Sequence, residues 1–141
     1  MLKNRVIPVL LIQDKGLVKT IKFKKSSYVG DPINAIRIFN EKEVDELVFL
    51  DISVTDEDRE PNLEMISDIA GEAFMPLAYG GGITSTRQAE KIFSLGIEKI
   101  IINTAAFLSP KLVSDLSKIS GSQSVVVSVD VRKSLFGKDE Y

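Results

Sequence analysis

The feature that most constrains the fold of this chain is a repeated alternation of short apolar runs with amphipathic helical patterns. Apolar runs recur at residues 6–12, 46–52, 76–79, 99–102 and 124–129. A stretch with apolar residues at helical spacing follows four of these five runs. This repeated strand–helix unit predicts an α/β fold with parallel strands.

The expected helices carry start and stop signals. Asp31 and Ser109 each stand as an N-cap directly before a proline, which is favoured at the first helical position. Gly96 and Gly121 stand where two of the helices should end. The predicted core faces are Ile33, Ala35, Ile36 and Phe39; Met65, Ile66, Ile69 and Ala70 in a helix over about 63–73; Ala89, Ile92 and Phe93; and Leu112, Val113 and Leu116.

Three consecutive glycines, Gly80, Gly81 and Gly82, lie between the third apolar run and the helix that follows it. Without Cβ atoms the backbone can approach an anion closely, and the N-terminus of the next helix favours negative charge. Asn103 and Thr104 follow the neighbouring strand, so the two loops should form one phosphate-binding pocket. The alternative is a tight strand-to-helix turn with no ligand.

Composition narrows the possible partners. The 141 residues predict one domain spanning 1–141, and 18 basic against 20 acidic residues give a net charge of −2. With no long run of either sign, neither nucleic acid nor an anionic membrane is favoured as a partner. The run at residues 6–12 is too short to cross a bilayer, and residues 1–5 show no signal peptide, which predicts a cytoplasmic protein.

The chain has neither cysteine nor histidine. Acid–base chemistry must therefore come from carboxylates, lysine or tyrosine, and a histidine metal site is excluded for this chain acting alone. Asp51 and Asp130 end two of the strands, where each could contact substrate or instead cap a loop or pair with a lysine. Two aspartates make a sparse set for a divalent cation, so we expect no metal and no cofactor.

The first connection, which contains Asp14, Lys19 and Phe23, is longer than the others and predicts a hairpin or a mobile flap. Loops at strand carboxyl ends of parallel βα folds bind ligands, so Lys19 is a candidate phosphate or substrate contact. The alternative is a solvated excursion of the chain.

The fifth apolar run has no helix after it. Because a closed (β/α)8 barrel needs roughly 200 residues or more, the sequence predicts the first half of a TIM barrel, a half-barrel domain truncated after strand five.

Four segments of the chain resemble the cyclase subunit of imidazole glycerol phosphate synthase, a lyase of histidine biosynthesis. The segments are residues 46–52 (ELVFLDI), 80–83 (GGGI), 103–106 (NTAA) and 122–130 (SQSVVVSVD). The resemblance covers the whole chain in order. It implies a (β/α)8 barrel of about 250 residues, of which this chain supplies four βα units and strand five.

The resemblance also implies roles for particular residues. It puts one phosphate of a bisphosphate substrate on Gly82, Asn103 and Thr104, while the second phosphate site lies in the later half of the barrel. In the family, ammonia joins this substrate with two aspartates as general acid and base. Asp130 matches one of them, but Leu11 stands where the other is expected, and Asp14 matches a different aspartate.

Leu11 cannot carry a proton, and this changes the expected function. Loss of half an acid–base pair should cost two to four decades of rate, on the order of 3 to 5 kcal/mol. The substitution favours a paralogue that passes ammonia on for amidino sugars of surface polysaccharides such as lipopolysaccharide. The alternatives are a true cyclase of histidine biosynthesis, with Asp14 compensating, and a noncatalytic half-barrel that binds phosphate and self-associates.

Arg5, Glu46 and Lys99 stand at the starts of three strands, where the resemblance implies an ammonia gate. The alternative is plain ion pairing at the stability face of a barrel. A glutaminase subunit would dock on this amino-terminal face, with Glu98 as a plausible contact.

The half-barrel should also self-associate, because strands one and five would be unpaired and would expose apolar residues. These residues are Val9, Leu11, Val125 and Val127, or their alternates.

Overall fold

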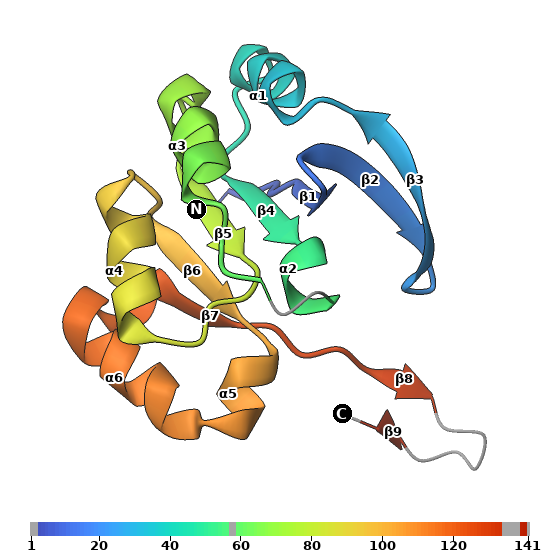
Figure 1. Ribbon diagram of the computed structural model, residues 1–141. Helices are drawn as coiled ribbons and strands as arrows, with labels where there is room; N and C mark the ends of the chain where they lie inside the picture. Colours follow the sequence, from blue (N-terminus) through green and yellow to red (C-terminus); the bar gives the residue numbers. More distant parts are fainter. Residues whose placement is uncertain (1–2, 57–58, 134–138, 141) are drawn as a thin grey trace.

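A computed structural model describes residues 3–56, 59–133 and 139–140 of the chain (Figure 1). Its main sheet has seven strands in the order β3-β2-β1-β4-β5-β6-β7. Five of them, β1, β4, β5, β6 and β7, run parallel to one another, whereas β2 and β3 are antiparallel additions to β1. The strands are β1 (Val9–Gln13), β2 (Gly16–Ile21), β3 (Lys24–Gly30), β4 (Leu47–Asp51), β5 (Leu77–Gly80), β6 (Lys99–Ile102) and β7 (Val125–Val127).

Four longer helices lie on one side of the sheet (Figure 1). They are α1 (Pro32–Glu41), α3 (Leu63–Glu72), α4 (Thr86–Ser94) and α6 (Pro110–Ser120), and each follows one of the first four parallel strands. Two short helices, α2 (Ser53–Asp56) and α5 (Thr104–Leu108), a 3-10 turn at Ser122–Ser124 and a small pair of strands, β8 (Arg132–Lys133) and β9 (Asp139–Glu140), complete the fold. The predicted α/β half-barrel is confirmed.

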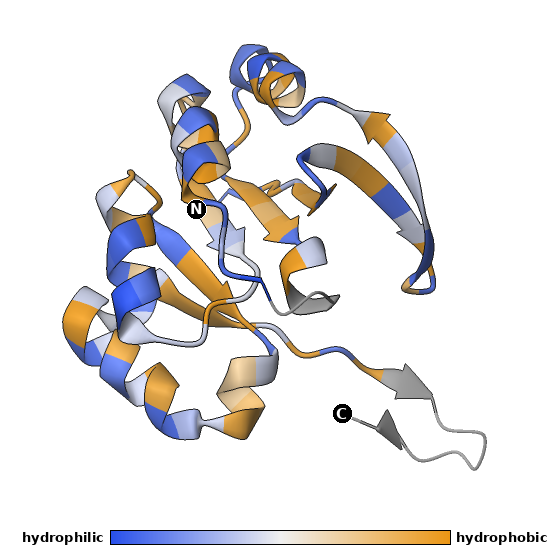
Figure 2. Cartoon of the chain, in the orientation of Figure 1, coloured by the Kyte–Doolittle hydropathy of each residue, from blue (hydrophilic) through white to orange (hydrophobic). Residues whose placement is uncertain are grey.

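The core lies between the sheet and these helices. Side chains of successive strand residues point to opposite faces, so Phe49, Tyr79 and Ile100 share the helix side with Ile36 and Ile92. All five are at most 1% exposed. Figure 2 shows the same division: the parallel strands are largely apolar, while the helices alternate polar and apolar residues.

The opposite face of the sheet is the interior face of the barrel. Register pairs bring Leu11, Leu50, Gly80, Ile101 and Val126 side by side across the five parallel strands. A Cβ atom added to Gly80 would lie 2.9 Å from both the Leu50 and Ile101 side chains, so this layer is already closely packed there. The layer forms an apolar floor, which we call the inner layer.

One expectation about the edges of the sheet was wrong. Strand β1 is paired on both sides, because the β2–β3 hairpin folds back on it with Leu11 opposite Val18. The outer strands of the main sheet are therefore β3 and β7. On β7 the inner-layer residue is Val126, whereas Val125 packs against the helix-side core.

The predicted helix caps are confirmed with one exception. Asp31 accepts a hydrogen bond from the Asn34 N–H at 3.0 Å, and Gly96 and Gly121 adopt φ values of 100° and 84° after their helices. Ser109 stands at the N-cap position of α6, but its side chain makes no capping hydrogen bond. Its N–H instead donates to Ala105 at 2.9 Å, because the same residue also ends α5. Within the described ranges, no helix is long and apolar enough to span a membrane.

Candidate functional site

A cavity of about 800 Å³ opens at the carboxyl ends of the parallel strands. Its apolar floor comes from the inner layer, through Leu11, Leu50 and Ile101. Its polar lining includes six residues that the sequence predicted as site residues: Asp51, Gly81, Gly82, Asn103, Thr104 and Asp130. The fold thus brings the ends of β4, β5, β6 and β7 to one place, as expected for parallel strands.

Lys19 is the one predicted substrate contact that does not line this cavity. It is exposed on β2, and its neighbour Thr20 lines the cavity instead, together with Phe23 at the end of the hairpin. Because neighbouring strand residues point to opposite faces, the register of the hairpin selects Thr20 over Lys19.

The glycine loop is held in a conformation that only glycine adopts easily. Gly81 and Gly82 have φ values of 144° and 63°. A Cβ atom on Gly82 would collide with the Val54 side chain and lie 3.1 Å from the Arg59 carbonyl oxygen. A Cβ atom on Gly81 would lie 2.6 Å from the Asp51 carbonyl oxygen. Helix α2 and the segment after it therefore pack directly against the glycine loop.

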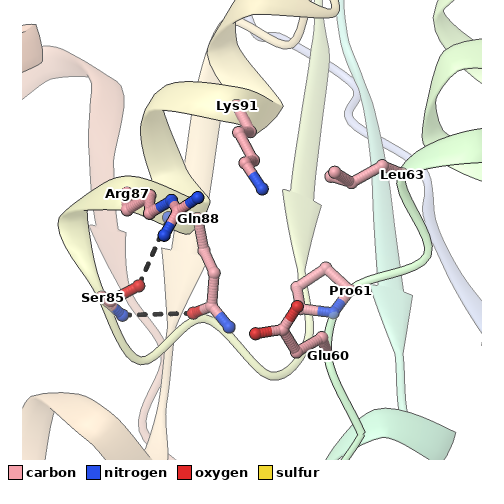
Figure 3. A pocket seen from close by; sticks show the side chains of 7 residues that line it. All are labelled: Glu60, Pro61, Leu63, Ser85, Arg87, Gln88 and Lys91. Carbon is pink, nitrogen blue, oxygen red and sulfur yellow. Dashed lines mark hydrogen bonds between the residues drawn. The ribbon is translucent and has the colours of Figure 1, made fainter.

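Side chains cap part of the N-terminus of α4. Ser85 accepts from the Gln88 N–H at 3.3 Å, and Gln88 Oε1 accepts from the N–H groups of Thr84 and Ser85 at 2.9 and 3.2 Å (Figure 3). This capping box takes up the N–H groups of Thr84, Ser85 and Gln88, so these three are not open to an anion, contrary to what the sequence predicted for the start of this helix. Within the described part of the chain, no hydrogen bond uses the N–H groups of Gly81 or Gly82. Among the described residues, the glycine backbone is therefore open to an anion.

A smaller cavity of about 200 Å³ lies beside this capping box (Figure 3). Its lining residues are Glu60, Pro61, Leu63, Ser85, Arg87, Gln88 and Lys91. Glu60 and Gln88 also line the larger cavity, so they form the wall between the two.

The Asp51 carboxylate is held by hydrogen bonds from the loop that follows it. Its carboxylate is buried and accepts from both the N–H and the hydroxyl of Ser53, at 3.1 and 2.5 Å. Tyr79, 1% exposed, lies beside it on the helix side. Burial, and then the negative charge of Asp51, raise the pKa of the Tyr79 phenol above its usual range. Its hydroxyl makes no hydrogen bond of ordinary geometry in the described structure, so Asp51 acts on it chiefly through charge. Tyr79 is therefore not a general base near neutral pH.

Asp130 is the cavity carboxylate with a partner on the neighbouring strand. Asn103 Nδ2 donates to Asp130 Oδ2 at 2.8 Å. Leu11 lines the same cavity from β1. Asp14 lies at the β1–β2 turn, where it adopts a φ of 49° and pairs with Arg59 at 3.0 Å. Asp14 is not among the residues that line the cavity, so this arrangement does not favour Asp14 as a replacement for the expected acid–base group at Leu11.

At the amino ends of the strands, the three predicted gate residues form one charge cluster. Glu46 Oε2 accepts from Arg5 Nη2 at 3.0 Å and from Lys99 Nζ at 2.6 Å. The Glu46 side chain is only 4% exposed, whereas those of Arg5 and Lys99 are 53% and 28% exposed. A buried carboxylate is thus held by two cations at the opposite end of the sheet from the cavity.

Some cavity residues were not predicted from the sequence. Val54, Arg59 and Glu60 come from α2 and the segment that follows it, and they reach the cavity only through tertiary packing. One local signal was available: aspartate two residues before serine, as in Asp51 and Ser53, is typical of a side-chain turn after a strand. In the part of the chain that the structure describes, no group of three or more acidic, histidine or cysteine residues could hold a metal ion.

The fold is that of half a (β/α)8 barrel, and the cavity lies at the carboxyl ends of the strands, where barrels of this class carry their sites. The family model described as histidine biosynthesis protein matches residues 5–140, and the chain belongs to this family.

Similar proteins with curated names cover nearly the whole chain. It is 60% identical to the putative imidazole glycerol phosphate synthase subunit hisF2 of Pseudomonas aeruginosa, over 97% of this chain and 55% of that protein. It is 54% identical to the putative subunit hisF3 of Vibrio vulnificus, over 97% of this chain and 53% of that protein. Identity to the imidazole glycerol phosphate synthase subunit HisF of Streptococcus mutans is 41%, over 94% of this chain and 53% of that protein. The chain spans about half the length of these relatives.

Proposed function

We propose that this chain is the amino-terminal half-barrel of a synthase-side subunit in a glutamine amidotransferase complex related to imidazole glycerol phosphate synthase. The subunit receives ammonia at the amino ends of its strands and delivers it to an acceptor at the carboxyl ends. The acceptor is a sugar that becomes an amidino sugar of a surface polysaccharide. The observation that carries this proposal is Leu11, which contributes an apolar side chain to the cavity that holds Asp130.

The cavity can position a phosphorylated acceptor but offers little proton transfer. Gly81 and Gly82 present N–H groups that no described residue bonds and that suit a phosphate, and Thr104 lines the same cavity. Among the described residues, three carboxylates line the cavity: Asp51, Glu60 and Asp130. Asp51 is engaged by Ser53, and Glu60 lies in the wall shared with the smaller cavity. Asp130 is therefore our candidate to exchange a proton with a bound molecule. Asp130 without a carboxylate at position 11 fits capture of ammonia by an acceptor that another enzyme has activated. It fits poorly the closure of a ring that needs both an acid and a base.

The interior supports an ammonia path. The Arg5–Glu46–Lys99 cluster lies at one end of the sheet and the cavity at the other, with the inner layer between them. Leu11, Leu50 and Ile101 give this layer an apolar surface, which favours neutral ammonia over ammonium because a charge without a partner is costly there. The cluster would admit ammonia at its mouth and the layer would conduct it.

The proposed glutaminase partner docks at the amino ends of the strands, where apolar side chains are exposed. Val6 and Phe74, both next to the amino ends of strands, are 67% and 89% exposed, and Glu98 is exposed beside Lys99. Large exposed apolar side chains at one face favour a protein partner there.

The test is turnover of the imidazole glycerol phosphate synthase substrate by the full-length protein, with high ammonium replacing the glutaminase. We expect no imidazole product from a folded protein that still binds a glutaminase. Turnover near that of an ordinary synthase would overturn the proposal and assign the chain to histidine biosynthesis.

A true cyclase is the second candidate, favoured by the Asn103–Asp130 pair in the cavity and by the 41% identity to the Streptococcus mutans protein. Leu11→Asp distinguishes the two, with Leu11→Asn as the matched uncharged control. A rise of two or more decades in ammonia-dependent turnover, seen with Asp and absent with Asn, would mean that only the missing carboxylate limits cyclisation. No rise means that the cavity has diverged further, as we expect.

A noncatalytic half-barrel that binds phosphate and self-associates is the third candidate. It is favoured by the exposure of Val9 and Val126, which are 55% and 39% exposed. Phosphate binding without glutaminase binding and without ammonia transfer would support it over the first two.

A further inference from the structure

Two polar side chains from neighbouring strands meet at the carboxyl end of the sheet. Asn103 directly follows β6, and Asp130 lies three residues beyond the end of β7. The Asn103 side-chain amide donates to the Asp130 carboxylate at 2.8 Å, and both residues line the large cavity. Hydrogen bonds to a charged acceptor are shorter and stronger than neutral ones.

The backbone around this pair is held on both sides. The Ser128 N–H donates to the Ile102 carbonyl at 2.9 Å, which extends the β6–β7 ladder to the residue before Asn103. The Asn103 carbonyl in turn accepts from the Ala106 N–H at 3.0 Å, inside the first turn of α5. Asn103 is thus fixed by main-chain bonds before and after its side chain reaches Asp130.

Asn103 does not make the capping hydrogen bond that its position before α5 would allow. It stands at the N-cap position of α5, where an asparagine side chain commonly accepts a hydrogen bond from the helix, yet it makes no such bond. Its amide is directed to the neighbouring strand instead. This use of the amide differs from the role that the sequence resemblance implies, in which Asn103 binds phosphate.

We propose that Asn103 is a positioning residue for Asp130. This inference rests on the proposed function, which makes Asp130 the carboxylate that exchanges a proton with the bound acceptor. The amide holds Oδ2, and no other hydrogen bond to Asp130 occurs among the described residues, so Oδ1 remains available to the reacting group. The phosphate is then bound chiefly by the glycine backbone and Thr104, and Asn103 contributes little to its affinity.

Nuclear magnetic resonance of the side-chain amides tests the contact itself. In the unaltered protein, one amide proton of Asn103 should be shifted downfield by the carboxylate, and Asp130→Ala should move it upfield. Asn40 is a control in the same spectrum, because its amide donates to the Glu72 carbonyl at 2.9 Å and should not respond. An Asn103 resonance that does not move in Asp130→Ala would overturn the proposal.

Titration with inorganic phosphate separates positioning from phosphate binding. We expect Asn103→Ala to change the phosphate affinity by no more than about twofold, while Gly82→Ala reduces it by about tenfold or more. A loss in Asn103→Ala as large as that in Gly82→Ala would overturn the positioning role in favour of phosphate contact. If the unaltered protein binds no phosphate, the phosphate part of the proposed function fails, and the amide resonances alone decide the role of Asn103.

Discussion

Glu46→Gln tests whether the charge cluster at the amino ends of the strands is a desolvated network. Glutamine keeps the size of the side chain but removes the charge, so Lys99, with a side chain 28% exposed, loses its counter-ion. Removing one partner of a fully buried ion pair costs about 3–5 kcal/mol. Arg5 is 53% exposed and can recover water, which lowers our estimate to about 2 kcal/mol.

Urea unfolding measures this cost. For a slope of about 2 kcal/mol per molar urea, the midpoint should fall by about 1 M. Glu72→Gln is the matched control, because Glu72 pairs with Arg37 at 3.4 Å on the surface, with side chains 42% and 60% exposed. That pair should contribute no more than about 0.5 kcal/mol. Equal midpoint shifts in the two variants would refute the reasoning and mean that the cluster is hydrated.

The double variant Glu46→Leu, Lys99→Met separates stability from ammonia passage. Apolar residues of similar volume often replace a buried ion pair at no loss of stability. We therefore expect the double variant to unfold at a higher urea concentration than Glu46→Gln. It should nevertheless lose glutamine-dependent ammonia transfer while retaining transfer from added ammonium. Unchanged glutamine-dependent transfer would show that the cluster has a structural role only.

Three further predictions concern the glycine loop, the buried tyrosine and the assembly. Gly82→Ala should destabilise the protein by about 1–3 kcal/mol in urea unfolding, because alanine at a φ of 63° meets Val54, whereas Gly30→Ala, with open space around it, should cost less than half as much. The raised pKa of Tyr79 means that folding favours the neutral phenol, so this contribution to stability is complete below about pH 10 and is lost as the pH rises further. The unaltered protein should therefore lose stability more steeply than Tyr79→Phe above about pH 10, and identical alkaline profiles would contradict the assignment. Sedimentation of the 141-residue chain should show a dimer or a larger species through its exposed apolar residues, and a compact, well-folded monomer would count against self-association.

The spacing of apolar residues predicted the parallel strands and the longer helices well, because each of these helices has one apolar face and each of these strands is largely apolar. The fourth run, Lys99–Ile102, is the strand β6 itself. The first run was predicted to begin three residues too early, since β1 begins only after Pro8, which lacks the N–H that a central strand needs. The short helices α2 and α5, with four and five residues, carry too little pattern to be predicted from periodicity.

The candidate site was predictable to the extent that it depends on parallel topology. Polar residues after neighbouring strands had to meet, and Asp51, Asn103 and Asp130 do so. The choice of Thr20 over Lys19 depends on the register of the hairpin, which the sequence pattern left open. The close approach of Val54 to Gly82 depends on where α2 packs, and no local sequence pattern predicts it.

The hairpin on β1 sets a condition on how the sheet can close into a ring. Among the described strands, the hairpin pairs with β1 at Leu11, Ile12 and Gln13, while Val9 and Leu10 pair with β4 alone. A further strand on this side of β1 can therefore form backbone hydrogen bonds with two residues of β1, not five. It must either pair with the amino-terminal part of β1 in a staggered register or displace the hairpin that carries Thr20 and Phe23 over the cavity. Closure and the shape of the cavity mouth are thus mutually dependent: the strand that completes the ring also determines whether the hairpin can remain where it is.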